Sequence, residues 1–132
     1  PGFATWQQVE EMAQVGMKIG CHTMHHSYIP LVPEERLQEE IIRSKHVIEE
    51  RIRRPVQVLS YPVGGYTPKA QALAQQAGYV AACTTNRADP QQARDRFALR
   101  RIKVTERDRH PLLLWAKLSG YYDLFRQLDT PS

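Results

Sequence analysis

The hydrophobic and polar positions of the first 21 residues predict a short helix followed by a buried strand. Thr5 and Gln8 have the spacing of a capping box, in which each side chain binds the backbone amide of the other residue. Apolar residues then recur at spacings of three and four as far as Ala13, and Gly16 stands where a left-handed residue would end the helix. The short apolar run over 17–21 is typical of a buried strand.

The segment 33–53 predicts the longest helix of the chain. Pro33 suits the first helical position, and Pro55 would stop the helix. The apolar residues of this segment share one helical face: Leu37, Ile41, Ile48 and Ile52. We therefore expect this face to pack on the core.

The pattern beyond Pro55 predicts three more strands and two more helices. The strands are expected over 56–60, 79–84 and 99–104, and the helices over 67–76 and 111–128. Strands that alternate with helices imply parallel strands covered by helices, which is an α/β sheet or barrel. Ligands meet such folds at the C-terminal ends of the strands, so His22 and the pair Tyr61-Pro62 are predicted neighbours of a site.

Composition narrows the class of protein. A chain of 132 residues with 42% hydrophobic content suits one domain with one core. The net charge is +4, and the basic residues are spread along the chain. The sequence contains no motif that combines aromatic and basic residues as nucleic-acid-binding modules do, so we expect no nucleic-acid partner. The chain contains no apolar run of about 18 residues, so the sequence predicts no membrane-spanning helix. The oligomeric state stays open, and so does the compartment, for which the bacterial cell envelope and the cytoplasm both remain possible.

Candidate chemistry concentrates in a histidine cluster directly after the first predicted strand. His22, His25 and His26 lie within five residues, and neutral imidazoles are good ligands for Zn²⁺ and related metals. If the segment turns once, His22 and His26 can point inward together, whereas the adjacent His25 and His26 would point apart. The residues alone leave two readings open, a metal site and a loop of surface histidines.

The segment His22-Thr23-Met24-His25-His26 resembles the His-[Ser/Thr]-x-x-His motif of polysaccharide deacetylases, carbohydrate esterase family four. Its flanks agree with that family, because a strand of the type Ile19-Gly20-Cys21 precedes it and a helix beginning Pro33-Glu34-Glu35 follows it. Leu59-Ser60-Tyr61-Pro62-Val63-Gly64 is similar to a variant of the family's third motif. The resemblance extends from about Thr5 to Leu118. It implies a partial, distorted parallel (β/α) barrel, with residues 1–132 forming a single domain that is incomplete at its N-terminus.

The resemblance also implies roles for individual residues. His22 and His26 would bind Zn²⁺ or another divalent transition metal. The backbone N–H of Val63 would help hold the oxyanion that forms on the acetyl group. Thr23 would steady the metal loop by hydrogen bonding, since outer groups of this kind fix imidazole orientation, although it could equally be an ordinary hydroxyl at a strand end.

Aromatic residues around the third motif are candidates for contact with a sugar. Tyr61 and Tyr66 flank the turn that contains Pro62, and aromatic walls suit sugar rings. We therefore assign Tyr61, Pro62 and Tyr66 to substrate binding, with simple packing of the two tyrosines as the alternative.

The sequence departs from the family at several positions. Nothing matches the first motif, a Thr-Phe-Asp-Asp-Gly segment that supplies the catalytic base and the third metal ligand, and we expect it to lie before Pro1. Ser27 replaces the proline after the second metal histidine, and Ser60 stands where an arginine orients the base. A late histidine that acts as general acid has no clear counterpart, because His110 lies just before a predicted helix.

The function that the resemblance implies is metal-dependent hydrolysis of acetyl groups from an N-acetylated polysaccharide, a polymer of N-acetylhexosamine. Two alternatives remain. In the first, the scaffold has lost catalysis and serves as a glycan-binding or structural domain. In the second, the enzyme hydrolyses another non-peptide C–N bond.

Overall fold

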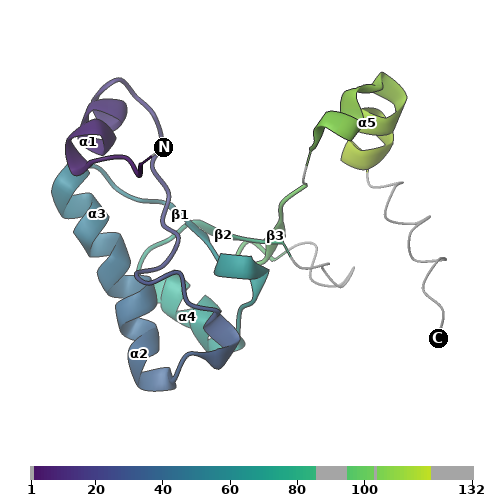
Figure 1. Ribbon diagram of the computed structural model, residues 1–132. Helices are drawn as coiled ribbons and strands as arrows, with labels where there is room; N and C mark the ends of the chain where they lie inside the picture. Colours follow the sequence, from purple (N-terminus) through teal and green to yellow (C-terminus); the bar gives the residue numbers. More distant parts are fainter. Residues whose placement is uncertain (1, 86–94, 103, 120–132) are drawn as a thin grey trace. The chain divides into compact units, whose positions relative to one another are not determined.

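The computed structural model describes residues 2–85, 95–102 and 104–119. It divides into two compact units, Pro1–Arg100 and Arg101–Ser132, which are described separately below (Figure 1). A single domain across the whole chain therefore stays a prediction. The last nine residues of the predicted closing helix, 120–128, lie outside the described residues.

The first helix forms where the capping box predicts it. Helix α1 spans Trp6–Gln14. The N–H of Thr5 donates to Oε1 of Gln8 at 2.8 Å, and the N–H of Gln8 donates to Oγ1 of Thr5 at 3.3 Å. Gly16 takes φ = 94°, the left-handed conformation that glycine adopts without strain. Both predicted ends of this helix are confirmed.

The strand predicted over 17–21 is wrong in its extent, because only Cys21 pairs with a neighbour. Cys21 forms an isolated parallel bridge with Leu59. Its N–H donates to the carbonyl of Val58 at 2.9 Å, and its own carbonyl accepts from the N–H of Ser60 at 2.8 Å. These two bonds place the residue before His22 at the same level as the end of the next strand.

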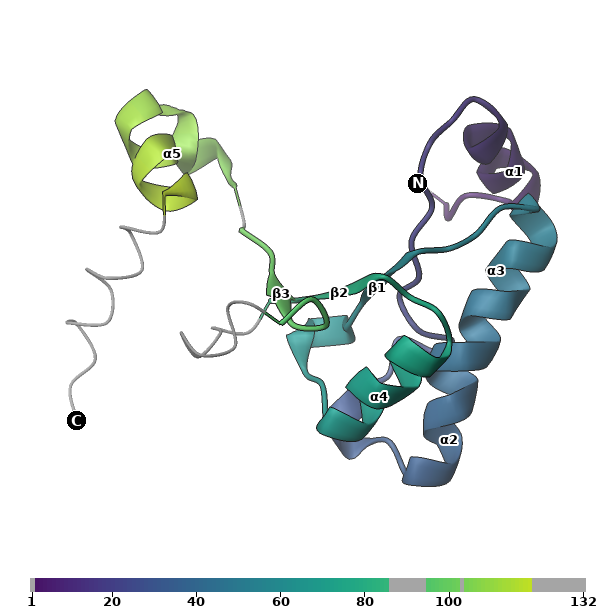
Figure 2. The ribbon, with the colours of Figure 1, turned by 180° about the vertical axis from the view of Figure 1, so that it is seen from behind.

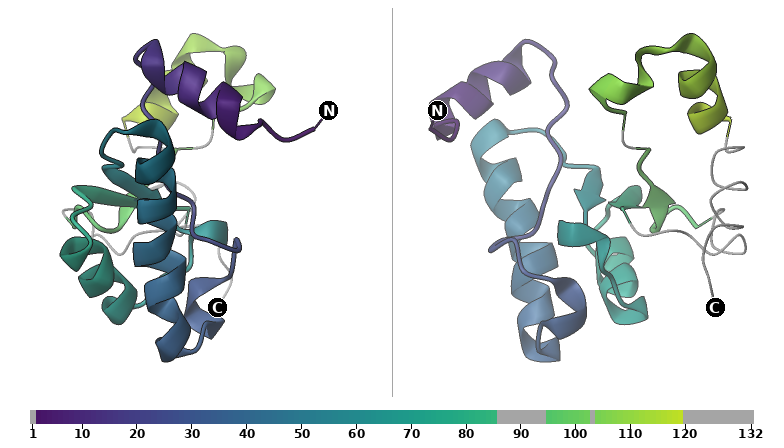
Figure 3. Two further views of the ribbon diagram at one scale, coloured as in Figure 1. Left: turned by 90° about the vertical axis from the view of Figure 1, so that its left-hand side faces the viewer. Right: turned by 45° about the vertical axis from the view of Figure 1, so that its right-hand side comes forward.

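The long predicted helix forms, but with a change of winding in its middle. It consists of α2 (Glu34–Gln38), a π-helical turn η2 (Glu39–Arg43) and α3 (Ser44–Ile52). Figure 3 shows these three segments as one continuous rod. The predicted apolar face packs on the core, with Leu37 and Ile41 buried. The apolar spacing did not predict the π turn, because one extra residue in a single turn changes the positions of the apolar residues very little.

A small parallel sheet follows, as predicted. Strands β1 (Val58–Ser60), β2 (Ala81–Thr84) and β3 (Leu99–Arg100) lie in the order β1-β2-β3, and both pairs are parallel. The third strand is shorter than the predicted 99–104. Helix α4 (Pro68–Gln76) connects β1 to β2, so strand, helix and parallel strand form the expected α/β unit.

The core of the first unit lies between the sheet and the helices. Leu59 and Ala82 point inward from β1 and β2, and both are fully buried. The long helix and α4 cover this face of the sheet and contact each other through α2 and η2 (Figure 2). Because the strands are parallel, the segments that follow Cys21, Ser60 and Thr84 all leave the sheet at one edge.

The second unit contains a 3-10 turn, Glu106–Arg109, and helix α5, Pro111–Leu118. His110 is the N-cap residue of α5, consistent with its predicted place just before a helix. Across the described parts of the chain, no helix combines the length and the apolar character that crossing a membrane requires.

Glu49 fastens the end of α3 to the segment that enters β1. Its Oε1 accepts the backbone N–H of Val56 at 2.8 Å and also binds the ammonium of Lys45. Burial alone would raise the pKa of Glu49, but the hydrogen bonds from Lys45 and Val56 lower it below its ordinary value. The ionised carboxylate therefore stabilises the folded state.

We predict that Glu49→Gln lowers the free energy of unfolding by about 1 kcal/mol at pH 7. Because the folded-state pKa of Glu49 is depressed, its contribution is present above the unfolded-state pKa of about 4.3 and is lost as the pH falls through the folded-state value. Urea unfolding of both proteins at pH 7 and at about pH 3 measures this, with the exposed Glu50→Gln as control. A difference that grows on acidification would contradict the prediction.

Candidate metal and glycan site

The orientation of His22 is fixed by the end of β1. Its Nδ1 lies 2.5 Å from the backbone carbonyl of Ser60. A carbonyl oxygen can only accept, so Nδ1 carries the proton and donates it. In the neutral ring this leaves Nε2 with its lone pair, the state in which an imidazole binds a metal.

His26 brings a second imidazole to the same place. The ring centroids of His22 and His26 lie 4.9 Å apart, with an interplanar angle of 79°. Two imidazoles that share a tetrahedral Zn²⁺ through bonds of about 2.0–2.1 Å have ring centres about 5 Å apart. The pair therefore fits a shared divalent metal, and both side chains are exposed. Within the described residues no third histidine, cysteine or carboxylate joins them, so these residues provide two of the ligands that such a metal needs.

The loop that carries the two histidines is held in a costly conformation. Thr23 has φ = 65° and His26 has φ = 57°, both in the left-handed region. That region costs residues other than glycine about 1–2 kcal/mol each, so the surroundings must hold it. Oγ1 of Thr23 is buried and has no hydrogen-bond partner among the residues that the structure describes, so the predicted hydrogen bond is not found there. A role of Thr23 in steadying the loop stays a prediction.

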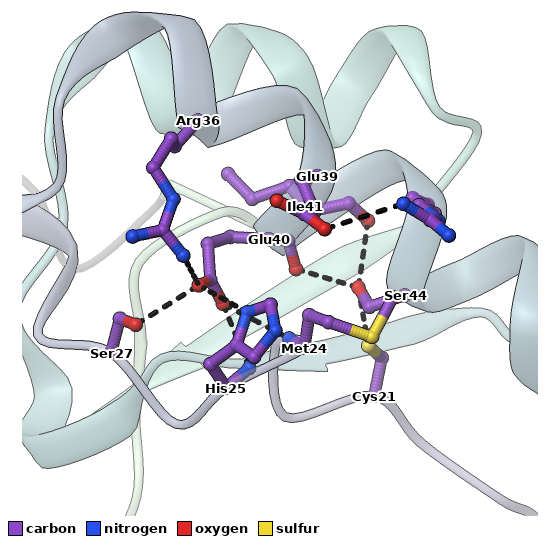
Figure 4. Close-up of polar contacts among 10 residues, drawn as sticks. Cys21, Met24, His25, Ser27, Arg36, Glu39, Glu40, Ile41 and Ser44 are labelled. Carbon is purple, nitrogen blue, oxygen red and sulfur yellow. Dashed lines mark hydrogen bonds and ion pairs between the residues drawn. The ribbon is translucent and has the colours of Figure 1, made fainter.

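Glu40 is a residue of this region that the sequence analysis missed. It lies in the π turn, its side chain is fully buried, and its carboxylate faces the histidine loop (Figure 4). Oε2 accepts the backbone N–H groups of Met24 and His25, each at 3.0 Å, and Oε1 accepts the hydroxyl of Ser27 at 2.9 Å. The sequence did contain a signal for it, because Glu40 lies three positions after Leu37 and so places a charged side chain on the apolar face of the helix.

The ring of His25 turns to Glu40 rather than to the other two histidines. Its Nδ1 lies 3.0 Å from Oε1 of Glu40, which agrees with the expectation that His25 and His26 point apart. Burial alone would raise the pKa of Glu40, but hydrogen bonds from His25, Ser27 and Met24 lower it below its ordinary value. Glu40 is therefore a buried carboxylate ion whose lost hydration is replaced by hydrogen bonds from this loop.

The turn after β1 presents Val63 at the surface in a strained conformation. Val63 has φ = 56° and is 69% exposed, and a β-branched residue rarely adopts this conformation. The hydroxyl of Thr85 donates to the carbonyl of Val63 at 3.0 Å. The hydroxyl of Thr84 donates to the carbonyl of Gly64 at 2.5 Å. The sequence analysis missed these two threonines, which hold the turn against the end of β2. The oxyanion role of the Val63 amide stays a prediction.

The residues assigned to sugar contact lie mostly in the core. The side chains of Tyr61 and Pro62 are fully buried, and Tyr66 is half-buried with its ring stacked on that of Tyr61 at 5.3 Å. Burial, and to a smaller degree the charge of Asp95, raises the pKa of Tyr61. The burial of Tyr61 favours the packing alternative for that tyrosine, and Pro62 is buried beside it. Their contact with a glycan stays a prediction.

Comparison with known proteins assigns this arrangement to a family. Residues 3–82 match the family model described as polysaccharide deacetylase, and the chain belongs to that family. The histidine loop, Glu40 and the turn at Val63 all lie within the matched residues.

Two curated relatives are similar to parts of the chain. YxkH of Bacillus subtilis (strain 168), a protein assigned to the polysaccharide deacetylases, is 30% identical over 101 residues, which cover 76% of this chain and 36% of the relative. The peptidoglycan-N-acetylglucosamine deacetylase of Bacillus cereus is 35% identical over 72 residues, which cover 54% of this chain and 33% of the relative. The chain thus spans about a third of the length of these curated relatives.

Solved structures confirm the predicted fold class, a part of the distorted (β/α) barrel of these deacetylases. The Streptococcus pyogenes deacetylase PplD in complex with acetate superposes with a TM-score of 0.74 at 25% identity, covering 86% of this chain and 50% of PplD. IcaB from Ammonifex degensii superposes with a TM-score of 0.68 at 25% identity, covering 88% of this chain and 54% of IcaB.

We predict that Val63→Gly preserves the turn and any function of its backbone amide. Glycine adopts φ = 56° without strain, a gain of about 1–2 kcal/mol, and this is partly offset by about 0.5–1 kcal/mol for its greater freedom in the unfolded chain. The free energy of unfolding, measured with urea, should therefore stay equal or rise by up to about 1.5 kcal/mol. Thr85→Val, which removes the hydroxyl that holds the turn, is the contrasting variant. A lower free energy of unfolding in Val63→Gly would contradict the prediction.

Proposed function

We propose that this protein is a metal-dependent hydrolase that removes acetyl groups from an N-acetylated glycan, with His22 and His26 supplying two ligands of a Zn²⁺ or similar ion. The observation that carries the proposal is the facing pair of imidazole rings, 4.9 Å apart, at the end of a strand. A curated relative named as a peptidoglycan-N-acetylglucosamine deacetylase supports the substrate class.

The residues of the chain prepare the site for such a metal. The Ser60 carbonyl keeps the proton of His22 on Nδ1 and so reserves Nε2 for coordination. A metal held by His22 and His26 would supply Lewis-acid chemistry, which polarises a carbonyl group and lowers the pKa of a water molecule to about 7.

The backbone N–H of Val63 would stabilise the negative charge that develops on the acetyl oxygen. The exposed position of Val63 beside the end of β1 lets this N–H approach the acetyl oxygen as negative charge develops there. One backbone or side-chain donor in such a role is worth about 2.7–4 kcal/mol of the barrier. Because this role uses the backbone, it does not require a particular side chain at position 63.

We predict that the whole protein binds about one zinc per chain and that replacing both His22 and His26 with alanine abolishes this binding. Elemental analysis after dialysis measures the metal, and acetate release from an oligomer of N-acetylglucosamine measures the reaction. His46→Ala is the matched control, because His46 is an exposed histidine on α3 whose ring lies 4.0 Å from a carboxylate oxygen of Glu49.

The outcomes separate the candidate functions. Unchanged zinc content in the double variant would refute the metal assignment. Zinc binding without acetate release from the glycan would favour hydrolysis of another non-peptide C–N bond. Glycan binding with neither zinc nor hydrolysis would favour a domain that has lost catalysis.

A further inference from the structure

Glu40 is a charged residue inside the core of the first unit. It lies on the π turn η2, and its side chain is fully buried. Burying a carboxylate is costly unless hydrogen bonds replace the water that it loses. An apolar residue at this position would pack on the same core without that cost, so packing does not account for the carboxylate.

Both carboxylate oxygens bind the histidine loop. Two backbone N–H groups, those of Met24 and His25, donate to Oε2, and the ring of His25 and the hydroxyl of Ser27 donate to Oε1 (Figure 4). The guanidinium of Arg36 lies 4.0 Å from Oε1 and adds a weak ion pair. One side chain thus receives four hydrogen bonds from three residues of a single short loop.

The residues that Glu40 holds alternate with the residues that face the proposed metal. Met24 and His25 lie between His22 and His26 in sequence, and Ser27 follows directly. The two left-handed residues, Thr23 and His26, flank the held pair. Strained residues of this kind persist only where the surrounding structure over-determines them, and the bonds to Glu40 provide that constraint.

We infer that Glu40 is a positioning residue of the proposed metal site: its buried carboxylate holds the loop 22–27 in the conformation in which the rings of His22 and His26 face each other. The inference rests on the proposed function. The carboxylate of Glu40 is used by its hydrogen bonds to Met24, His25 and Ser27, so Glu40 acts through the loop that it binds.

Glutamine is the most conservative replacement that removes the charge of Glu40. It keeps the size and shape of the side chain, but one oxygen becomes an NH₂ group, which donates and does not accept. At the Oε2 position that group would face the backbone N–H groups of Met24 and His25, which can only donate. At the Oε1 position it would force the hydroxyl of Ser27 and the ring of His25 to accept instead of donate, and in both cases the negative charge is lost. Glu39→Gln is the matched control, because Glu39 is the preceding residue, is partly exposed and pairs only with Arg43 among the contacts of its carboxylate given by the structure.

The experiment measures the zinc dissociation constant of the whole protein by competition with a chelator, together with urea unfolding of each variant. We expect Glu40→Gln to weaken zinc binding by about 10- to 100-fold, the range typical of outer-shell partners, and Glu39→Gln to match the original protein. Lower global stability produces a loss of this size only in a variant that is about 1–10% folded, because the apparent dissociation constant rises by the inverse of the folded fraction, and urea unfolding would reveal such a variant. A variant that is about 90% folded would lose only about 1.1-fold.

If Glu40→Gln does not fold, the donors are removed singly in His25→Ala and Ser27→Ala. Each variant loses one hydrogen bond and should bind zinc about two- to tenfold more weakly. Zinc binding equal to that of the original protein in Glu40→Gln, or in both donor variants, would overturn the inference and leave the proposed function intact. An original protein that binds no zinc would overturn both.

Discussion

The parallel pairing of Cys21 with the first strand is the constraint on which the candidate site depends. Two backbone hydrogen bonds, to Val58 and from Ser60, fix the level of Cys21 against β1. Gly20 allows this approach, because a Cβ there would lie 3.3 Å from the carbonyl of Val58. As a result His22 emerges beside the end of β1, where the Ser60 carbonyl sets its tautomer. The bridge thus joins the histidine loop to the turn at Val63, although about 40 residues separate them in the sequence.

The site is built from strained loops that buried groups hold in place. The left-handed residues Thr23 and His26 belong to the loop that Glu40 binds, and the left-handed Val63 belongs to the turn that Thr84 and Thr85 bind. The segment directly after the histidine loop packs against the end of the Val63 turn, because a Cβ at Gly65 would lie 2.2 Å from the ring of Tyr28 and 2.9 Å from Pro30. Strain that is fixed in this way is typical of functional sites. It gives the exposed groups a defined geometry at the cost of some stability.

Local signals in the sequence predicted much of this structure, and long-range contacts account for what was missed. The capping box at Thr5 and the apolar face of the long helix depend on neighbours three or four residues away, so they could be read directly. The facing of His22 and His26 followed from their spacing. In contrast, the bond from Thr85 to Val63 joins residues 22 positions apart, and the partners of Glu40 lie 13–16 positions away. Tyr61 looked like a sugar-binding aromatic, but its burial is set by the packing of the helices and the sheet, which the sequence does not show.

If the proposed site is right, His22 and His26 converge on one metal ion while His25 faces Glu40. NMR of the histidine ring nitrogens, recorded as zinc is added to the whole protein, distinguishes these roles. His22 should carry its proton on Nδ1 throughout, and zinc should shift its Nε2 together with one ring nitrogen of His26, while the ring of His25 is little affected. Coordination through Nδ1 of His22, or a zinc-dependent shift of His25 in place of His26, would contradict the proposed site.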